Sequence, residues 1–319
     1  MALSTQTLNF ALAISTKKLS SIVDLVRSAA ATAALPAFAN STPLAILRCL
    51  LGLLIVAAVL HPSSECQIAR PDVTTKAIAQ FERKPLQTTS LGDDIYLLAG
   101  DGANIVAVAD RSSTLLIDSG MESRTSELNS AVFSATHRPI TEVINTNWHF
   151  DHTGGNIFFG TAGASIIAHS HIKKRLSSRQ EVRYINLQDG PYPAQVLPTI
   201  TFIDHLELDQ GSQHLHLVSA ESAHTDGDTI AYLEPANIVV VGDIFSQPFY
   251  PVIDVNSGGS LQGIIDSIDK VLSATDERTK FIPGHGPVAT RADLQAYRNM
   301  LMTSQERIEA TGSTAPQQL

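Results

Sequence analysis

The most informative part of this sequence is Thr146-Asn147-Trp148-His149-Phe150-Asp151-His152-Thr153-Gly154-Gly155-Asn156. It places His149, Asp151 and His152 directly after a short strand predicted at residues 142–145. So dense a cluster cannot all face one side of a regular strand or helix, whereas a loop can aim alternate side chains at one point. Imidazole and carboxylate groups are the ligands that zinc favours. The stretch therefore predicts a metal-binding loop; the alternative is a polar turn whose histidines only cap.

Three further segments have the same design. Each places a histidine or an aspartate just after a predicted apolar strand, close to a glycine: His224-Thr225-Asp226-Gly227, Gly242-Asp243 and Gly284-His285-Gly286. Strand ends from two packed sheets can meet at one edge of a sandwich, so these side chains can converge with the first cluster. Each segment alone is a weak signal, but the four together indicate a metal site.

Short apolar runs alternate with helical stretches from residue 95 onward. Strands are predicted at residues 95–98, 104–109, 114–118, 142–145, 164–168, 201–204, 214–218, 229–233, 237–241 and 280–282. Helices are predicted at residues 122–135, 172–179, 261–272 and 291–309. Two half-domains of strands followed by helices predict a sandwich of two sheets with helices outside.

Taken together, the four segments resemble the metallo-β-lactamase superfamily over residues 91–301. The hallmark of that superfamily is His-x-His-x-Asp-His, followed by a lone His, an Asp or its replacement, and a last His. The resemblance implies an α/β protein with the αββα fold, two mixed β-sheets flanked by helices, and one or two zinc ions per chain. The ligands that it implies are His149 and His224 for the first metal, Asp151, His152 and His285 for the second, and Asp243 between the two.

The chain departs from the hallmark at its first position, where Asn147 replaces histidine. We expect Asn147 to bind the first metal through its carbonyl oxygen, which is a poorer zinc ligand than imidazole. A mono-zinc carbapenemase subclass also has asparagine there. That subclass needs a cysteine where Asp243 stands and an arginine where His152 stands, and this chain has neither. We therefore expect a strong second site and a first site weakened by Asn147.

The resemblance further implies a zinc-dependent hydrolase of small molecules. A metal-activated hydroxide, oriented by Asp151 or Asp243 as catalytic residues, would attack a carbonyl carbon. The first expectation is β-lactamase-like hydrolysis of a β-lactam amide. One alternative is a thioester or lactone hydrolase similar to glyoxalase II, which Asp243 as a bridging ligand favours. The other is a non-catalytic metal-binding member of the fold, since metal ligands indicate a chemistry and not a substrate.

Residues 1–70 differ in composition from the rest of the chain. They hold both cysteines, Cys49 and Cys66, so no disulfide can join parts of the remaining chain. An apolar run at residues 44–60 suits the hydrophobic core of an export signal and could just span a bilayer as an anchor. We expect a signal or anchor region with a linker over residues 1–70, a catalytic domain over 71–319, and a periplasmic or secreted protein that is either released or anchored through 44–60. An over-long start, an organellar transit peptide and a buried helix are the alternatives.

The overall composition excludes one class of function. The 319 residues are 44% hydrophobic and 17% charged, which is typical of a globular chain, and the net charge is -9. A nucleic-acid-binding protein needs a basic surface, so no nucleic-acid partner is expected. The oligomeric state is not indicated.

Some conspicuous side chains lie outside the predicted ligand set. Asp228 is expected to stabilise the turn after His224. Trp148 and Phe150 are expected in the core or the pocket wall, and His169, His171, His214 and His216 at the surface or in packing. Four aromatic residues in loop-like stretches could line a substrate groove: Tyr184, Tyr192, Phe249 and Tyr250.

Overall fold

Strongly apolar strands form the centre of the first sheet, which has seven strands. The computed structural model describes residues 84–100, 102–182 and 187–310. The strands of this sheet, in spatial order, are β1 (Gln87–Gly92), β2 (Ile95–Ala99), β3 (Ile105–Ala109), β4 (Thr114–Ile117), β5 (Ile140–Asn145), β6 (Ser165–His169) and β9 (Ile200–Phe202). Pairing is antiparallel from β1 to β4 and parallel from β4 to β9. β3 and β4 are buried throughout, so both faces of this sheet must be covered.

The second sheet has five strands, which are β10 (His205–Gln210), β11 (Gln213–Ala220), β12 (Asp228–Glu234), β13 (Ile238–Ser246) and β14 (Lys280–His285). β10 and β11 alternate between buried and more exposed residues, whereas β12, β13 and β14 are mostly buried. β10 to β13 pair antiparallel, and β13 and β14 pair parallel. A two-stranded hairpin, β7 (Gln180–Val182) with β8 (Leu187–Asp189), lies apart from both sheets.

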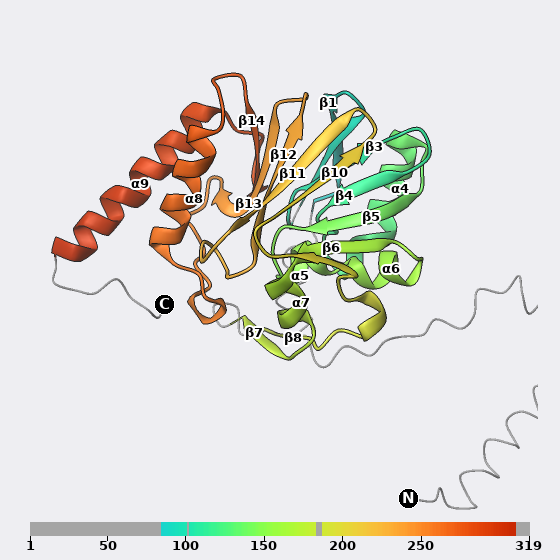
Figure 1. Ribbon diagram of the computed structural model, residues 1–319, viewed down its shortest axis with the longest axis horizontal. Helices are drawn as coiled ribbons and strands as arrows, with labels where there is room; N and C mark the ends of the chain where they lie inside the picture. The colour runs from blue at the N-terminus through green and yellow to red at the C-terminus, as the bar shows by residue number, and fades with distance from the viewer. Residues whose placement is uncertain (1–83, 101, 183–186, 311–319) are drawn as a thin grey trace, which may run out of the picture. The chain divides into compact units, whose positions relative to one another are not determined.

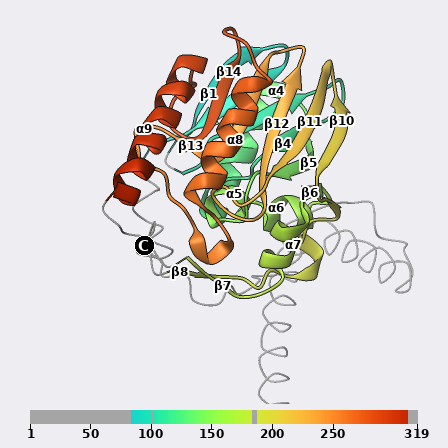
Figure 2. The same cartoon turned by 60° about the vertical axis from the view of Figure 1, so that its left-hand side comes forward.

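Helices flank the sandwich on both sides (Figure 1). The α-helices are α4 (Thr125–Thr136), α5 (Phe150–Thr153), α6 (Asn156–Thr161), α7 (Ser170–Leu176), α8 (Leu261–Ser273) and α9 (Arg291–Ala310). Short 3-10 turns are η1 (Glu122–Arg124), η3 (Ala194–Val196) and η4 (Val255–Ser257). The turned view shows α8 and α9 side by side on the outer face of the second sheet (Figure 2).

Three apolar layers hold these elements together. Leu97 and Val106 of the first sheet pack with Leu215 and Leu217 of the second to fill the space between the sheets. A second cluster joins the second sheet to α8 and α9, and a third joins the first sheet to α4 and α6. Burial of apolar surface in three layers is the main stabilising force of such a fold. The fold class expected from the sequence, two mixed sheets flanked by helices, is confirmed.

The structure corrects several element boundaries. β13 and β14 run on to Ser246 and His285, so Asp243 and His285 lie near the ends of strands and not after them. The ladder stays together because Gly242, with φ +55°, takes up a register shift between the two strands. The predicted strand at 201–204 is shorter, as β9, and β10 and the β7–β8 hairpin were not predicted. α7 begins two residues earlier and ends three residues earlier than its predicted range.

The predicted boundary at residues 70 and 71 and the apolar run at 44–60 lie outside the described residues. Among the residues that are described, none of the helices combines the length and the apolar character needed to cross a bilayer.

Candidate metal centre

The histidine loop is shaped by a buried network beneath it. Asp118, directly after β4, accepts hydrogen bonds from the backbone N–H and the hydroxyl of Thr146, each at 2.7 Å. The chain then turns into the short helix α5 at Phe150. A Cβ on Gly154 would lie 2.4 Å from the backbone nitrogen of Glu122. Glycine is therefore required there, because the loop passes directly against the chain after β4.

The first group of potential ligands combines side chains from three separate segments. His149, His224 and Asp243 each offer one ligand atom, and these atoms lie within 4.8 Å of one another. His149 Nδ1 is 3.0 Å from His224 Nε2, and His224 Nε2 is 3.4 Å from Asp243 Oδ2. The two histidines are buried. The structure thus brings together the three residues expected at the first metal.

The second group lies against the first. Asp151, His152 and His285 also offer ligand atoms within 4.8 Å of one another, with His285 Nε2 3.3 Å from Asp151 Oδ2. Asp243 reaches this group too, since its Oδ2 is 3.0 Å from His152 Nε2 and its Oδ1 is 3.4 Å from His285 Nε2. A single carboxylate therefore contacts histidines of both groups.

Each of the four histidines is held from behind by an acceptor on its second ring nitrogen. The pairs are His149 Nε2 with Asp254 at 3.1 Å, His152 Nδ1 with Asp118 at 2.8 Å, His224 Nδ1 with the Val252 carbonyl at 2.7 Å, and His285 Nδ1 with the Gly102 carbonyl at 3.0 Å. An acceptor there fixes the tautomer and leaves the inward nitrogen free to bind a cation. These partners were not predicted. Asp118 and Asp254 could have been noticed as acids in the surrounding loops, but backbone carbonyls leave no signal in a sequence.

The pKa values of the ligand side chains show that the buried carboxylates favour positive charge in this site. Burial alone lowers the pKa of His152, but Asp243, Asp118 and Asp151 together raise it well above the usual value. Burial raises the pKa of Asp243, but the nearby histidines lower it well below its usual value. Burial likewise opposes ionisation of Asp151, yet His152 and His285 bring its pKa down to about 2. Protons on the histidines thus offset the carboxylates, a balance that a metal cation would supply instead.

The donor set fits a divalent transition metal. Nitrogen and carboxylate oxygen atoms converge in threes, as zinc prefers. Within the described part of the chain, the buried atoms His152 Nε2 and Asp243 Oδ1 form no hydrogen bond of ordinary geometry, although other ligand atoms lie close to them. Buried polar atoms are usually satisfied, so these two inward atoms are suited to a ligand between the groups.

A model of the metallo-beta-lactamase superfamily matches residues 98–285, which span every one of these histidines and acids. The chain belongs to the metallo-beta-lactamase superfamily. Members are generally hydrolases that bind zinc, and the two groups described above are where such ions would be held.

Solved structures of the superfamily share the fold. A metallo-beta-lactamase from Pontibacter korlensis has a TM-score of 0.58 and 17% identity, over 68% of this chain and 99% of that one. DIM-1 metallo-beta-lactamase has a TM-score of 0.57 and 17% identity, over 69% and 98%. TMB-1 has a TM-score of 0.56 and 16% identity, over the same shares. At these identities the likeness establishes the fold alone.

Asn147, the departure from the superfamily hallmark, is buried beside the first group. Its Oδ1 accepts a hydrogen bond from the backbone N–H of His149 at 2.9 Å, and its Nδ2 donates to Asp243 Oδ2 at 3.2 Å. A backbone N–H can only donate, which fixes the orientation of the amide. The amide nitrogen, and not the oxygen, therefore faces Asp243. That Asn147 binds metal stays a prediction.

The other conspicuous side chains have ordinary places. Trp148 and Phe150 are buried in the cluster around α5 and α7. Asp228 accepts hydrogen bonds from the N–H and the hydroxyl of Thr225, as expected of a carboxylate that stabilises the turn. His214 is exposed and contacts Asp209 at 2.8 Å. Of the four aromatic residues, Tyr192 is buried, Phe249 and Tyr250 are exposed, and Tyr184 lies outside the described residues.

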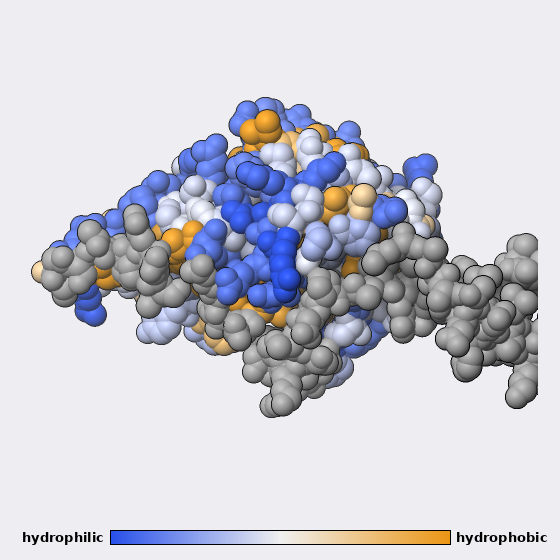
Figure 3. Space-filling model, turned by 90° about the horizontal axis from the view of Figure 1, so that it is seen from below, coloured by the Kyte–Doolittle hydropathy of each residue, from blue (hydrophilic) through white to orange (hydrophobic). Residues whose placement is uncertain are grey.

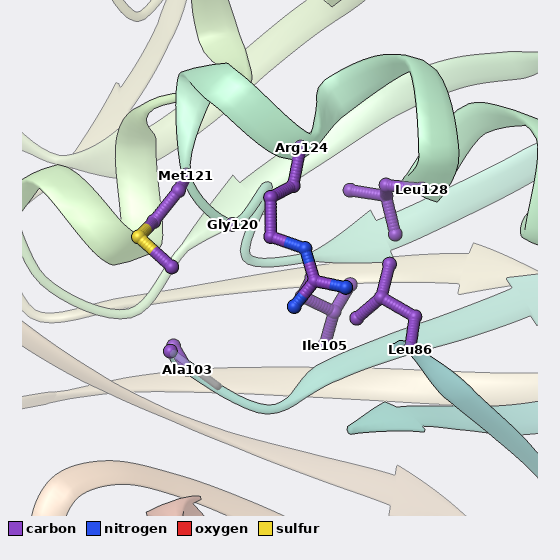
Figure 4. Close-up of a pocket in the computed structure, with 8 residues that line it drawn as sticks. Leu86, Ala103, Ile105, Gly120, Met121, Arg124 and Leu128 are labelled. Carbon is purple, nitrogen blue, oxygen red and sulfur yellow. The ribbon is translucent and has the colours of Figure 1, made fainter. Parts of the chain in front are cut away.

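A small pocket lies between η1, α4 and the segment before β3 (Figure 4). Its lining is mainly apolar, including Leu86, Ile105 and Leu128, and it contains none of the potential metal ligands. The guanidinium of Arg124 points into it and pairs with Glu127 at 2.7 Å. The positive charge of Arg124 is therefore paired with Glu127 and does not belong to the metal centre.

Proposed function

We propose that this chain is a zinc-dependent hydrolase with two adjacent metal ions that adds water to a carbonyl group. The observation that carries the proposal is the position of Asp243, whose carboxylate contacts His152 and His285 of one group and His224 of the other. A carboxylate so placed can serve two cations at once. His149 and His224 would hold one ion. The other ion would be held by Asp151, His152 and His285. Asp243 would contribute to both sites.

Zinc supplies Lewis acidity, which lowers the pKa of water and polarises a carbonyl oxygen. The chain supplies orientation and charge. With a pKa of about 2, Asp151 is ionised at neutral pH and can accept a hydrogen bond from the attacking water. His285 is the most exposed of the four histidines, with 27% of its side chain accessible. This exposure supports entry of the substrate from the side of the second group.

Of the candidate substrates, the geometry favours a lactone or a thioester. A carboxylate between the two metals, in the place of Asp243, is the feature that distinguishes the glyoxalase II-like branches named above. β-Lactam hydrolysis is the second candidate. It is supported by the fold that the chain shares with DIM-1 metallo-beta-lactamase and by the same carbonyl chemistry.

The test is a hydrolysis panel on the purified full chain, with zinc content measured on the same sample. Nitrocefin, a carbapenem, a neutral acyl-homoserine lactone and S-lactoylglutathione separate the candidates, and His152→Ala serves as the inactive control. Turnover of the lactone or the thioester above the control supports the first candidate. A chain that binds zinc and turns over no member of the panel contradicts the proposal and indicates a non-catalytic member.

We also propose that residues 1–70 direct the chain across or onto a membrane, on the strength of the apolar run at residues 44–60. Cell fractionation and the mass of the mature N-terminus test this. Recovery of the full-length chain in the cytosol contradicts it.

A further inference from the structure

One exposed hydrophobic segment lies in the loop that follows β13. Phe249, Tyr250 and Val252 have exposed fractions of 63%, 81% and 41%. Single exposed apolar side chains are common, but three within four residues form a patch that needs an explanation. Seen from below, the end of the molecule that carries α5 and α7 shows hydrophobic surface beside a hydrophilic centre (Figure 3). We call Phe249, Tyr250 and Val252 the apolar lip.

The apolar lip is tied to both groups of ligands. Its loop begins where the Gln247 N–H donates to the carbonyl of His285 at 2.9 Å. It continues to the Val252 carbonyl, which accepts from His224 Nδ1 at 2.7 Å. It then reaches Asp254, which contacts His149 Nε2 at 3.1 Å. The backbone on either side of the lip therefore contacts histidines of both groups, so the lip lies next to the metal centre.

The segments that hold or contact the ligands carry acids but no lysine or arginine. These segments are residues 102–104, 118–121, 146–161, 221–227, 242–260 and 284–290. Arg175, from α7, pairs with both oxygens of Asp226, at 2.7 and 2.6 Å. Arg124 pairs with Glu127. The segments that hold or contact the ligands thus offer an incoming carboxylate no cationic side chain.

We propose that the substrate is an uncharged lactone, ester or thioester whose apolar acyl or aryl group packs against Phe249, Tyr250 and Val252. The inference rests on the proposed function and adds to it the class of substrate. Hydrolysis adds the hydroxyl of water to the carbonyl carbon, breaks the carbon–oxygen or carbon–sulfur bond, and returns the proton to the departing atom. The apolar lip takes the part of the acyl group that does not react, and the acidic surroundings disfavour a second negative charge there.

The contribution of the lip to binding is measurable because each methylene of the acyl chain adds to the apolar surface that is buried. Each methylene that the lip covers improves binding by up to about fourfold. We compare kcat/KM for N-butanoyl and N-decanoyl homoserine lactones and for a decanoyl analogue that ends in a carboxylate. The full chain is expected to prefer the decanoyl lactone over the butanoyl one by roughly tenfold or more, and to lose that preference with the carboxylate.

Two substitutions locate the effect. In the double variant Phe249→Ser, Tyr250→Ser the ratio of decanoyl to butanoyl kcat/KM should fall to about one, because the acyl chain loses its surface. Phe133→Ser is the matched control, since Phe133 is an exposed aromatic residue on α4 and far from the loop in sequence. It should keep the ratio of the unaltered chain.

Binding provides a readout apart from turnover. The non-hydrolysable decanoyl γ-lactam should bind the zinc-loaded chain more tightly than its butanoyl counterpart by calorimetry, and the double variant should remove the difference. If no lactone is hydrolysed but the decanoyl lactam still binds more tightly than the butanoyl one, the proposed hydrolase function fails and the apolar binding site is supported. If all lactones react at equal rates, or the carboxylate analogue is preferred, the lip is overturned and the hydrolase function stands.

Discussion

The two groups of ligands share Asp243 but differ in charge and exposure. The first group has two buried histidines and only the shared carboxylate. The second adds Asp151 as a carboxylate of its own and the partly exposed His285. His149 in the first group has its pKa lowered by burial, whereas His152 in the second has its pKa raised well above normal by the acids around it.

This difference in charge predicts a difference in zinc affinity between the two groups. The carboxylates of the second group attract a dication strongly, since their negative charge is concentrated in a buried place. The first group depends on two neutral nitrogens and on Asp243. We therefore infer that the second group binds zinc more tightly and that the first completes the centre at higher zinc concentration.

The largest effect is expected from Asp243→Ala, because this carboxylate contacts both groups. Zinc affinity at both sites and kcat/KM should fall by more than the roughly 100-fold that a change of an outer partner costs. Asp209→Ala removes an exposed acid from β10 and is the control for a change of net charge. Metal analysis after gel filtration makes the measurement. Two zinc ions retained in Asp243→Ala would break the picture of a shared ligand.

A somewhat smaller change is expected from His152→Ala, which removes one ligand of the tighter group. The variant should lose the tightly held zinc and nearly all activity. His216→Ala, at a half-buried histidine on β11 outside both groups, serves as the matched control. Full metal content with unaltered turnover in His152→Ala would show that the second group is wrongly assigned.

Asn147→His tests the weaker group directly. A histidine supplies the nitrogen that the superfamily hallmark has at this position, so first-site zinc affinity should rise by roughly tenfold or more. The same change removes the amide that donates to Asp243. Calorimetric zinc titration of both proteins makes the comparison. Equal stoichiometry and affinity would show that position 147 does not govern the first metal.

The smallest effect concerns Asp228, in the turn after His224. Burial raises its pKa to about 6 in the metal-free chain. A raised carboxyl pKa stabilises the fold fully below the unfolded value, near pH 4, and this contribution is lost as the pH rises through about 6. In Asp228→Asn the free energy of unfolding of the metal-free protein should therefore change less between pH 4 and 7, by at most roughly 3 kcal/mol. Identical pH dependence of urea unfolding in both proteins would contradict the shift.

The sequence predicted the parts of this site that are side chains at strand ends. His149, Asp151, His152, His224, Asp243 and His285 were all predicted as ligands, and the structure brings them together in two adjacent groups that could hold metal ions. Their grouping depended on the family resemblance, since the spacing of His224, Asp243 and His285 cannot show which strands are neighbours. The direction of the Asn147 amide could not be predicted either, because it is set by one backbone N–H in the folded loop.

The limits for the fold have a similar cause. Apolar runs revealed the central strands, because burial on both faces leaves a continuous signal. β10 was missed because its residues His205, Glu207 and Asp209 face solvent at the edge of the second sheet. The extension of β13 past Gly242 was missed because glycine usually marks the end of a strand, whereas here it absorbs a register shift.

The most direct test of the central claim is a calorimetric titration of the metal-free full chain with zinc. We predict two binding steps per chain, a tighter one that is absent from His152→Ala and a weaker one that Asn147→His strengthens. The fluorescence of Trp148, the single tryptophan, should follow the weaker step, since its ring centroid lies 4.6 Å from that of His149. A single step of one zinc ion, or a tight step that survives in His152→Ala, would contradict two unequal sites that share Asp243.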